Sequence, residues 1–412
     1  MINKILDVYL KENLVGKLIQ TDFGMLEFTY ADAWLENNNS IPLSWSLPLR
    51  KEPFKQKECR GFFAGILPEE SNRDIIARIL GISSKNDYAM LEQIGGECAG
   101  AITFLPENEP FPNNDYAYKE LSEQQLSNAL AQLPNRPLLA GEEGVRISLA
   151  GAQNKIAVHV DEQGKISLPL GGAPSTHILK PAIDRFPNVV SNEALCLKLA
   201  KAIGIPTIDV STGKAEDTEY LLVKRYDRIT ADGIYPERLH QEDFCQALKN
   251  PPETKYQSEG GPNLKACFAL IREASTLPAV DIQNLLNMVI FNIIVGNHDA
   301  HSKNFSLLFN NGQIRLAPAY DILSTIYYPE LTPKMAMKIG KEYESNKLLL
   351  KDFESFAHDT NLSFPLVKKR IVEIAEKVEA SLPKMKEKYS QISDLIDIIL
   401  DRAERFKIKC SN

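Results

Sequence analysis

The sequence lacks the features that mark several classes of protein. Its six cysteines are scattered over 412 residues, and no two of them form a Cys-x-x-Cys pair. Neither a zinc site nor a disulfide framework is therefore indicated, and we expect a reduced, cytoplasmic protein. The first ten residues carry Lys4 and Asp7 inside the only apolar run there, so we expect no secretory signal peptide. No internal repeat or low-complexity tract is present.

Charge and hydropathy exclude further classes. The formal net charge of −7 argues against a general nucleic-acid or membrane binder. The most apolar helix candidate, near residues 280–296, is interrupted by Asn284, Asn287 and Asn292, so we expect no transmembrane segment. A hydrophobic content of 44% and a charged content of 25% are ordinary for a folded soluble chain. A chain of 412 residues is too long for one simple core, which predicts two or three domains or lobes.

The N-terminal part predicts a small α+β module over residues 1–106. Short strands are expected in 3–30, with turns at 11–13 and 22–24, and a polar loop in 36–60. A helix should begin after Pro68 and end at Gly81, and a second helix should run from about Asn86 to Ile94. A strand at 101–105 precedes a Pro- and Asn-rich stretch, 106–114, which we interpret as a linker.

A capping-box pattern at Ser122-Glu-Gln-Gln125 predicts a helix that ends near residue 133. The stretch Arg146-Ile-Ser-Leu-Ala-Gly-Ala-Gln-Asn-Lys155 then reads as strand, small-residue turn, strand. Gly151 between two alanines allows backbone N–H groups to approach an anion closely, and Lys155 adds a positive charge. The pattern is weak, because it is neither a Walker A loop nor a Gly-x-Gly-x-x-Gly loop. A plain β-hairpin turn is the simpler interpretation of this stretch alone.

The next elements favour an anion site. A short strand ends in Lys180, and an amphipathic helix begins at Asn192-Glu193 and ends before Gly204. In a kinase N-lobe, a turn is followed by a lysine on a strand and then by a glutamate on a helix. The lysine reaches the ATP phosphates, and the glutamate orients the lysine. Alternatively, Glu193 is a first-turn acid that interacts with the helix dipole. A strand over 219–226 then brings polar groups to the position where a lobe connection would meet the nucleotide.

Residues 292–304 are the strongest candidate for an active site. An apolar helix leads there into a loop with two His, an Asp, a Lys and an Asn within seven residues. Two hypotheses compete. Gly296-Asn297-His298-Asp299 matches an element of binuclear metallophosphoesterases, whereas Asp299-x-x-x-x-Asn304 has the spacing of a kinase catalytic loop.

The rest of the chain favours the kinase hypothesis. A binuclear phosphoesterase needs an upstream Asp-x-His, a Gly-Asp pair and a downstream Gly-His-x-His, and the sequence contains none of them. A kinase needs a further carboxylate for Mg²⁺, and Asp321 follows a predicted hairpin over 305–316 at the position of that ligand. We therefore predict an ATP- and Mg²⁺-dependent kinase of α+β, two-lobed, protein-kinase-like fold, with an N-lobe over 115–228 and a mainly helical C-lobe over 229–412.

Two further segments carry little regular pattern. Residues 250–265 form a long loop, and long loops inside compact domains are usually functional or mobile. Residues 324–345 contain Lys334, Lys338 and Lys341 and are predicted to be irregular, as an activation-type or substrate-docking segment or as a solvated loop. Residues 349–408 are predicted to be helical.

The sequence also resembles the HipA-type serine/threonine kinases of bacterial toxin–antitoxin systems, over nearly its whole length. The stretches that carry the resemblance are Gly61–Glu70, Ile94–Ala101, Arg146–Lys155, Leu179–Pro181, Asn192-Glu193, Lys224–Arg228, His298–Phe305 and Leu316–Ile322. The resemblance implies a phosphatidylinositol-kinase-like fold with a small N-terminal subdomain. It also implies a toxin that phosphorylates a protein, such as an aminoacyl-tRNA synthetase or another translation component. A DNA-binding antitoxin of helix-turn-helix type would neutralise it, so contact with DNA would be indirect.

The resemblance assigns roles to individual residues. It places autophosphorylation on Ser148, the catalytic base on Asp299, and the Mg²⁺ ligands on Asn304 and Asp321. The mechanism that follows as a hypothesis has Lys303 stabilise the transferring phosphoryl group. The expected ATP-binding residues are Ala150, Gly151, Ala152, Gln153, Lys155, Lys180, Glu193, Lys224, Tyr226, Asp227 and His301. Asn297-His298 departs from the family pattern, although the Asp-x-His-x-Lys-Asn core is intact. The alternative is a catalytically weak or inactive kinase-fold module that acts as a co-repressor with its antitoxin.

Overall fold

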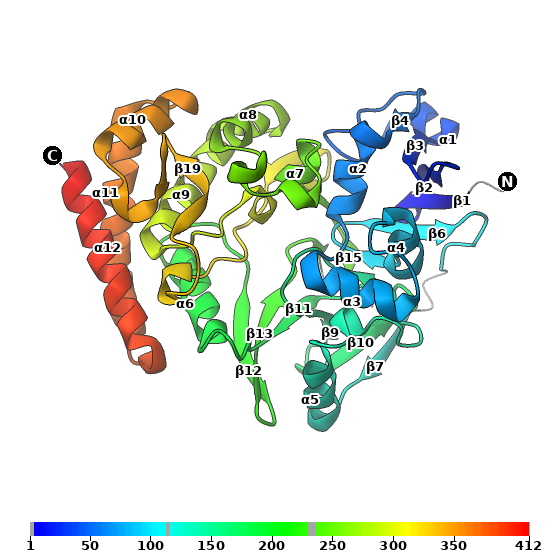
Figure 1. Cartoon of the computed structure of the whole chain (residues 1–412), viewed down its shortest axis with the longest axis horizontal. Coiled ribbons are helices and arrows are strands. Elements are labelled where there is room, and N and C mark those ends of the chain that lie inside the picture. The colour runs from blue at the N-terminus through cyan, green and yellow to red at the C-terminus, as the bar shows by residue number, and fades with distance from the viewer. Residues whose placement is uncertain (1–3, 113–115, 230–235, 412) are drawn as a thin grey trace. The chain divides into compact units, whose positions relative to one another are not determined.

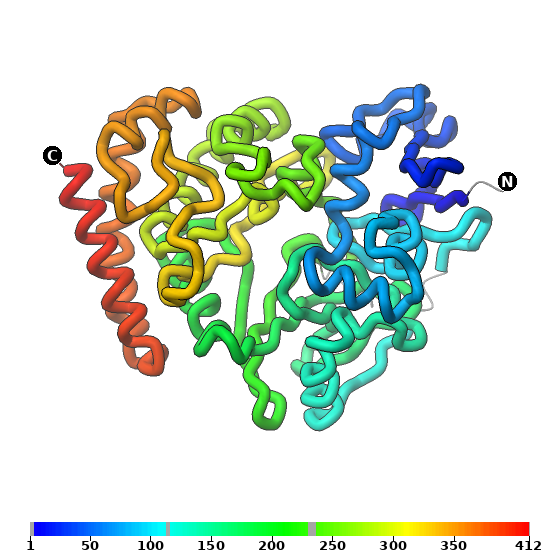
Figure 2. The backbone as a smooth tube through the Cα atoms, in the orientation of Figure 1, coloured from blue at the N-terminus to red at the C-terminus, as the bar shows by residue number. Residues whose placement is uncertain are grey.

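The computed structural model of the chain describes residues 4–112, 116–229 and 236–411 (Figures 1 and 2). The chain forms two compact units, and each is assembled from three separate segments. Unit 1 comprises Met1–Pro181, Gly213–Glu253 and Leu308–Gln313, and unit 2 comprises Ala182–Thr212, Thr254–Leu307 and Ile314–Asn412. The predicted domain limits at 106, 115 and 228 stay predictions, and residues 113 and 114 of the predicted linker lie outside the described residues.

Unit 1 begins with a five-stranded sheet in the order β4-β3-β2-β1-β6. Its strands are β1 (Lys4–Leu10), β2 (Asn13–Gln20), β3 (Leu26–Tyr30), β4 (Phe54–Lys55) and β6 (Ile102–Pro106). The predicted turns of this module are confirmed, with Lys11 and Gly24 both at positive φ. Every second residue of β3 is buried, as expected for a strand with one face on a core.

Helices α2 (Gln56–Gly65), α3 (Glu70–Leu80) and α4 (Asp87–Ile94) accompany this sheet. The two predicted helices α3 and α4 are confirmed, and α3 ends at Gly81 in the left-handed conformation, φ 67°. The prediction of a loop over 36–60 was wrong at its end, because α2 begins at Gln56. The first turn of α2 is polar, so the sequence there resembles a loop, although the helix buries Phe62 and Phe63.

A second sheet has the order β12-β13-β11-β9-β10-β7. Its strands are β7 (Ala117–Glu120), β9 (Ile156–Val160), β10 (Ile166–Leu170), β11 (His177–Pro181), β12 (Val210–Ala215) and β13 (Thr218–Lys224). The capping box at Ser122 is confirmed at the start of α5 (Glu123–Gln132). The interpretation of residues 146–158 as a hairpin was wrong. β8 (Ile147–Ser148) pairs in parallel with β5 (Glu97–Cys98), whereas β9 pairs with β10 and β11.

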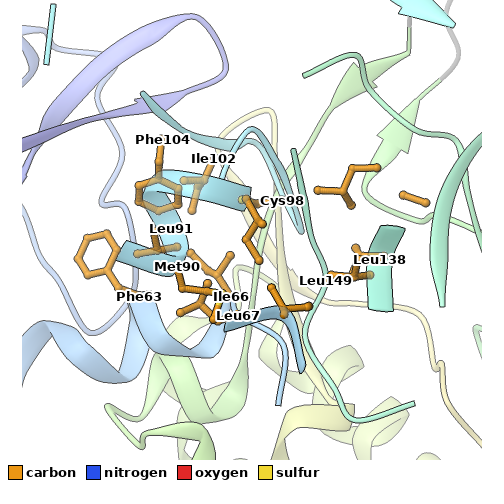
Figure 3. Packing of buried hydrophobic residues seen from close by; sticks show 14 of the residues in the cluster. Phe63, Ile66, Leu67, Met90, Leu91, Cys98, Ile102, Phe104, Leu138 and Leu149 are labelled. Atoms are coloured by element: carbon orange, nitrogen blue, oxygen red, sulfur yellow. The ribbon is translucent and has the colours of Figure 1, made fainter. Parts of the chain in front are cut away.

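One apolar core extends through unit 1 from the first sheet to β11. Figure 3 shows part of it, with Phe63 and Leu67 of the α2 region close to Leu91 of α4 and Phe104 of β6. Leu149, which directly follows β8, belongs to the same core and is 4% exposed. The N-terminal module and the small-residue turn therefore share one packed interior.

Unit 2 is mainly helical (Figure 1). It contains α6 (Val189–Ala202), α8 (Leu264–Ala274), α9 (Pro278–Val295), α10 (Leu350–Asp359), α11 (Phe364–Ser381) and α12 (Ser393–Ser411). The prediction of helices over 349–408 is confirmed. By length and composition alone α9 qualifies as a membrane-spanning candidate, but 61% of it is buried inside the protein, as in the core helix of a soluble fold.

Two predictions in this unit need correction. Residues 324–345 are not irregular throughout, because β19 (Lys334–Ile339) and β20 (Glu342–Glu344) form an antiparallel pair that buries Met335 and Met337. The helix predicted to begin at Asn192 begins at Val189 instead. Asn188 precedes it at φ 59°, a local break that the helical periodicity of the sequence does not reveal.

A buried acid in unit 1 makes stability depend on pH. Glu242 in β16 (His240–Asp243) is fully buried and accepts hydrogen bonds from Ser44 Oγ (2.5 Å) and the backbone N–H of Trp45 (2.7 Å). Burial outweighs these bonds and raises the pKa of Glu242 from 4.5 to about 8. The folded state therefore holds a proton that the unfolded state releases, and stability falls as pH rises through the window from 4.5 to about 8.

We predict that Glu242→Gln, which keeps the shape and removes the ionisable group, raises the melting temperature at pH 8 by about 2–4 °C. The gain should be much smaller at pH 5, where Glu242 is protonated in the folded state. Calorimetric scans of both proteins at the two pH values measure this difference. An equal gain at both values would contradict the prediction.

Candidate active site

The predicted site residues fall in both units. Unit 1 holds Ser148, Ala150, Gly151, Ala152, Gln153, Lys155, Lys180, Lys224, Tyr226 and Asp227, and unit 2 holds Glu193, Asp299, His301, Lys303, Asn304 and Asp321.

The loop after α9 is held by hydrogen bonds between residues that are close in the sequence. The helix ends at Gly296 with φ 73°, a position where a Cβ atom would lie 2.5 Å from Ile326. The Asn297 side chain then donates to Asn292 Oδ1 (2.9 Å) and accepts from the N–H of Asp299 (3.1 Å). The Asp299 carbonyl accepts from the N–H of His301 (2.7 Å) and from Nδ2 of Asn304 (3.1 Å). Asp299 and Asn304, predicted from their spacing, are thus held in contact.

The carboxyl of Asp299 is half-buried and accepts a hydrogen bond from a tyrosine. Tyr256 Oη donates a hydrogen bond to Asp299 Oδ1 (2.9 Å), and the Tyr256 ring packs edge-on against His301. Burial raises the pKa of the Asp299 carboxyl, and the charge of Asp321 adds to this rise, whereas His301 and the Tyr256 hydroxyl oppose it. A raised carboxyl pKa beside a second carboxylate is typical of an acid–base site. Sequence reasoning missed Tyr256, for which the only signal was the length of the loop over 250–265.

His298 has a structural part in this loop. Its Nε2 lies 2.8 Å from Ser345 Oγ, its N–H donates to Thr325 Oγ1 (2.8 Å), and its carbonyl accepts from the N–H of Ala336 in β19 (2.7 Å). Burial lowers the pKa of His298 to about 4, so the ring is neutral at pH 7. His298, which departs from the family pattern, therefore anchors the loop.

Asn304 and Asp321 carry side-chain oxygens of the kind that bind Mg²⁺. Because Asn304 Nδ2 donates to Asp299, its Oδ1 remains the acceptor end of the amide. Asp321 is held at φ 55°, an uncommon conformation that clusters at functional sites. The preceding Tyr320 donates to the carbonyl of Lys303 (2.7 Å) and so fastens the Asp321 segment to the loop. One amide and one carboxylate oxygen fit the hard ligand set of Mg²⁺.

Glu193 lies on α6 and is 2% exposed. Since α6 begins at Val189, Glu193 is in the second turn, and its interpretation as a first-turn acid was wrong. The neighbouring Asn192 donates to the carbonyl of Ser324 (3.0 Å) and accepts from its N–H (2.8 Å). This reciprocal pair joins α6 to the segment that follows Asp321, and sequence reasoning did not identify it.

The small-residue turn in unit 1 is held by the N-terminal module. Gly151, at φ 102°, donates its N–H to Glu69 Oε1 (3.1 Å), and the carbonyl of Ala152 accepts from Asn72 Nδ2 (2.8 Å). Ser148 is fully buried and donates to the carbonyl of Ile66 (3.0 Å). Lys155 Nζ bridges the turn to the carbonyl of Ala150 (2.7 Å). Glu69 and Asn72 were missed, because in the sequence they only mark the start of a helix.

The other predicted nucleotide residues of unit 1 lie on or near β11 and β13. Lys180 is 8% exposed in β11, whereas Lys224 is exposed at the end of β13. Tyr226 Oη donates to Gln241 Oε1 (2.8 Å). Gln153 lies on the turn itself.

Asp227 belongs to a buried ionic cluster. Its Oδ1 accepts a hydrogen bond from Arg225 Nε (2.9 Å), and its Oδ2 accepts from Arg225 Nη2 (2.8 Å) and from the N–H of Gly100 (2.7 Å). The carboxylate also forms an ion pair with Arg228 (2.9 Å), and the two arginines bind Glu97 as well. Although burial opposes ionisation, Arg225 and Arg228 hold the pKa of Asp227 well below its usual range. Both carboxylate oxygens are thus engaged by protein, so Asp227 supports the 224–228 segment, and its contact with ATP stays a prediction.

Comparisons with known proteins cover both units. The family model of the HipA N-terminal domain matches residues 6–105, and that of the HipA-like C-terminal domain matches residues 147–385. Y4mE of Sinorhizobium fredii, provisionally named a kinase, is 45% identical over 405 residues, which are 97% of this chain and 94% of the relative. The serine/threonine-protein kinase toxin HipA of Shewanella oneidensis is 25% identical over 391 residues, 92% of this chain and 88% of the relative.

A solved structure supports the fold. The HipA chain in the complex of Shewanella oneidensis HipA, HipB and operator DNA superposes with a TM-score of 0.87 at 24% identity, covering 98% of each chain. This likeness confirms the predicted α+β kinase-like fold with a small N-terminal part and a mainly helical C-terminal part. The matches together confirm the resemblance found in the sequence.

We predict that Glu69→Ala or Asn72→Ala loosens the 148–155 turn. The loss of one hydrogen bond should speed hydrogen–deuterium exchange in peptides that contain Gly151 about threefold to tenfold. Asp74→Ala, an exposed position on the same helix α3, is the matched control and should leave this exchange unchanged. Equal exchange in all variants would show that the turn supports itself.

Proposed function

Because the chain belongs to the HipA family, we propose that it is an ATP- and Mg²⁺-dependent serine/threonine protein kinase and the toxin of a toxin–antitoxin pair. The observation that carries the proposal is the ordered loop that ties Asp299 to Asn304, with Asp321 fastened beside it through Tyr320 and Lys303. These are the residue types that phosphoryl transfer needs in a base and in metal ligands.

In the proposed reaction Asp299 accepts the proton of a serine or threonine hydroxyl while the oxygen attacks the γ-phosphorus in line. Its raised pKa favours proton acceptance over that by an ordinary exposed carboxylate. Asn304 and Asp321 would hold Mg²⁺, which when bound neutralises charge on the phosphate oxygens. Lys303, which is 7% exposed, would stabilise the transferring phosphoryl group.

Nucleotide binding is assigned to the residues predicted from the sequence. The N–H groups of Ala150, Gly151 and Ala152, together with Lys155 and Lys180, would hold the phosphates, and Glu193 would orient Lys180. Gln153 and His301 would also contact the nucleotide. Lys224 and Tyr226 would border the adenosine, with Asp227 supporting them from its ionic cluster.

The proposed off-switch is autophosphorylation of Ser148. Its hydroxyl is buried against the carbonyl of Ile66, so a phosphate of about −1.5 to −2 charges does not fit there without displacement of the turn. The displaced turn would no longer present its N–H groups to ATP.

The proposed partners follow from the relatives. A helix-turn-helix antitoxin would bind the chain and connect it to DNA, as supported by the HipA–HipB–operator complex. The substrate would be a cytoplasmic translation component such as an aminoacyl-tRNA synthetase. The alternative is a catalytically weak or inactive co-repressor module with the same partner.

We predict that Asp299→Asn lowers transfer of label from γ-³²P-ATP, to itself and to proteins of a bacterial lysate, by at least about 10²-fold, because the base is lost. ATP affinity, measured by calorimetry, should change far less. If the wild-type chain labels neither itself nor any lysate protein, the co-repressor alternative is favoured.

We also predict that Ser148→Asp abolishes measurable ATP binding in calorimetry, since a buried negative charge would displace the turn. Ser148→Ala, which removes the hydroxyl without adding charge, is the control and should keep binding within about threefold. Unchanged affinity in Ser148→Asp, with its melting temperature preserved, would refute the proposed switch.

A further inference from the structure

We propose that Tyr256 is a positioning residue, which fixes the carboxylate of Asp299 so that Oδ2 faces the acceptor hydroxyl. The inference rests on the proposed kinase function of this site. It extends the site to the loop over 250–265, whose role the sequence left open.

The contact between Tyr256 and Asp299 is direct. Tyr256 Oη donates to Oδ1 at 2.9 Å, and within the described ranges 4–112, 116–229 and 236–411 no hydrogen bond reaches Oδ2. The terminal torsion of an aspartate is broad, so without a partner the carboxylate samples many orientations. A hydrogen bond to one oxygen removes this freedom and decides which oxygen is presented.

The tyrosine is itself well anchored. Its carbonyl accepts from the N–H groups of Glu259 (3.0 Å) and Gly261 (2.9 Å), which closes a tight turn. At Gly261 a Cβ atom would lie 2.3 Å from the carbonyl of Thr254, so the turn requires glycine there. The adjacent Gln257 accepts from the N–H of Lys338 in β19 (3.0 Å).

The ring of Tyr256 is also fixed from the side of the catalytic loop. Its centroid lies 5.4 Å from that of His301 at an interplanar angle of 75°, an edge-on packing that restricts ring rotation. In addition, Ser302 Oγ is 3.5 Å from the carbonyl of Lys255. A segment anchored at the turn, at β19 and at the catalytic loop suits a fixed support better than a gate.

In the proposed step the acceptor oxygen forms a bond to the γ-phosphorus as the bond to the ADP oxygen breaks, and the acceptor proton passes to Asp299 Oδ2. Tyr256 keeps its own proton and continues to donate to Oδ1. It is therefore not consumed, and its contribution lies in the turnover rate rather than in ATP binding.

The test compares wild type with Tyr256→Phe, which keeps the ring and removes the hydroxyl. Full-length chain carrying Asp299→Asn serves as the acceptor protein, with γ-³²P-ATP as donor. We expect kcat to fall about tenfold or more while the KM for ATP stays within about twofold. Tyr327→Phe, which removes a tyrosine–carboxylate hydrogen bond to Asp394 in the same unit, is the matched control and should retain the wild-type rate.

A crystal structure of the Tyr256→Phe variant decides the inference independently of activity. We expect the Asp299 carboxylate to rotate or to show more than one orientation. An unmoved carboxylate overturns the inference, as does an unchanged kcat, a rise in kcat or an effect confined to the KM for ATP. If the wild-type chain transfers no label, the proposed kinase function fails, and the orientation of Asp299 in the variant still tests the positioning role.

Discussion

The side chain of Asn297 is the link on which the loop over residues 296–304 depends. It is nearly fully buried, and it connects the last turn of α9, through Asn292, to the backbone of Asp299. Each such bond contributes only about 0.5–1.5 kcal/mol, but a buried amide left unpaired would cost more. The long apolar helix α9 is buried and rigid. Because Asn297 bonds both α9 and the backbone of Asp299, it holds the polar loop in a fixed position relative to the helix. The side chains of Asn304, Tyr256 and Tyr320 then form hydrogen bonds to groups of a loop whose backbone is already fixed.

The small-residue turn in unit 1 depends on a different constraint. It has little internal structure, and its position comes from Leu149 in the apolar core and from Glu69 and Asn72 of the N-terminal module. The module is therefore a structural part of the proposed nucleotide site. This arrangement also explains why a serine directly before the turn is completely buried.

The sequence could predict what short-range chemistry determines. The capping box at Ser122, the left-handed Gly81 and the Asn311-Gly312 turn between β17 (Ser306–Asn310) and β18 (Gln313–Leu316) are local signals, and the structure has all of them. The proximity of Asp299 to Asn304 was predictable because only four residues lie between them. Partners distant in sequence were not predictable: β8 pairs with β5 across 50 residues, and Tyr256 reaches Asp299 from 43 residues away. No local pattern encodes such pairings, since they depend on how elements pack.

The interleaving of the two units has a consequence for synthesis on the ribosome. Domains generally fold in order as they leave the ribosome, the N-terminal one first. Here unit 1 needs Leu308–Gln313 for completion, and unit 2 needs the last helix, so most of the chain must emerge before either unit can close. The nascent polypeptide therefore exposes apolar surfaces of unfinished units for most of its translation. A fragment that ends early contains neither complete unit. Under the proposed function, activity would therefore depend on synthesis of every segment that the two units share.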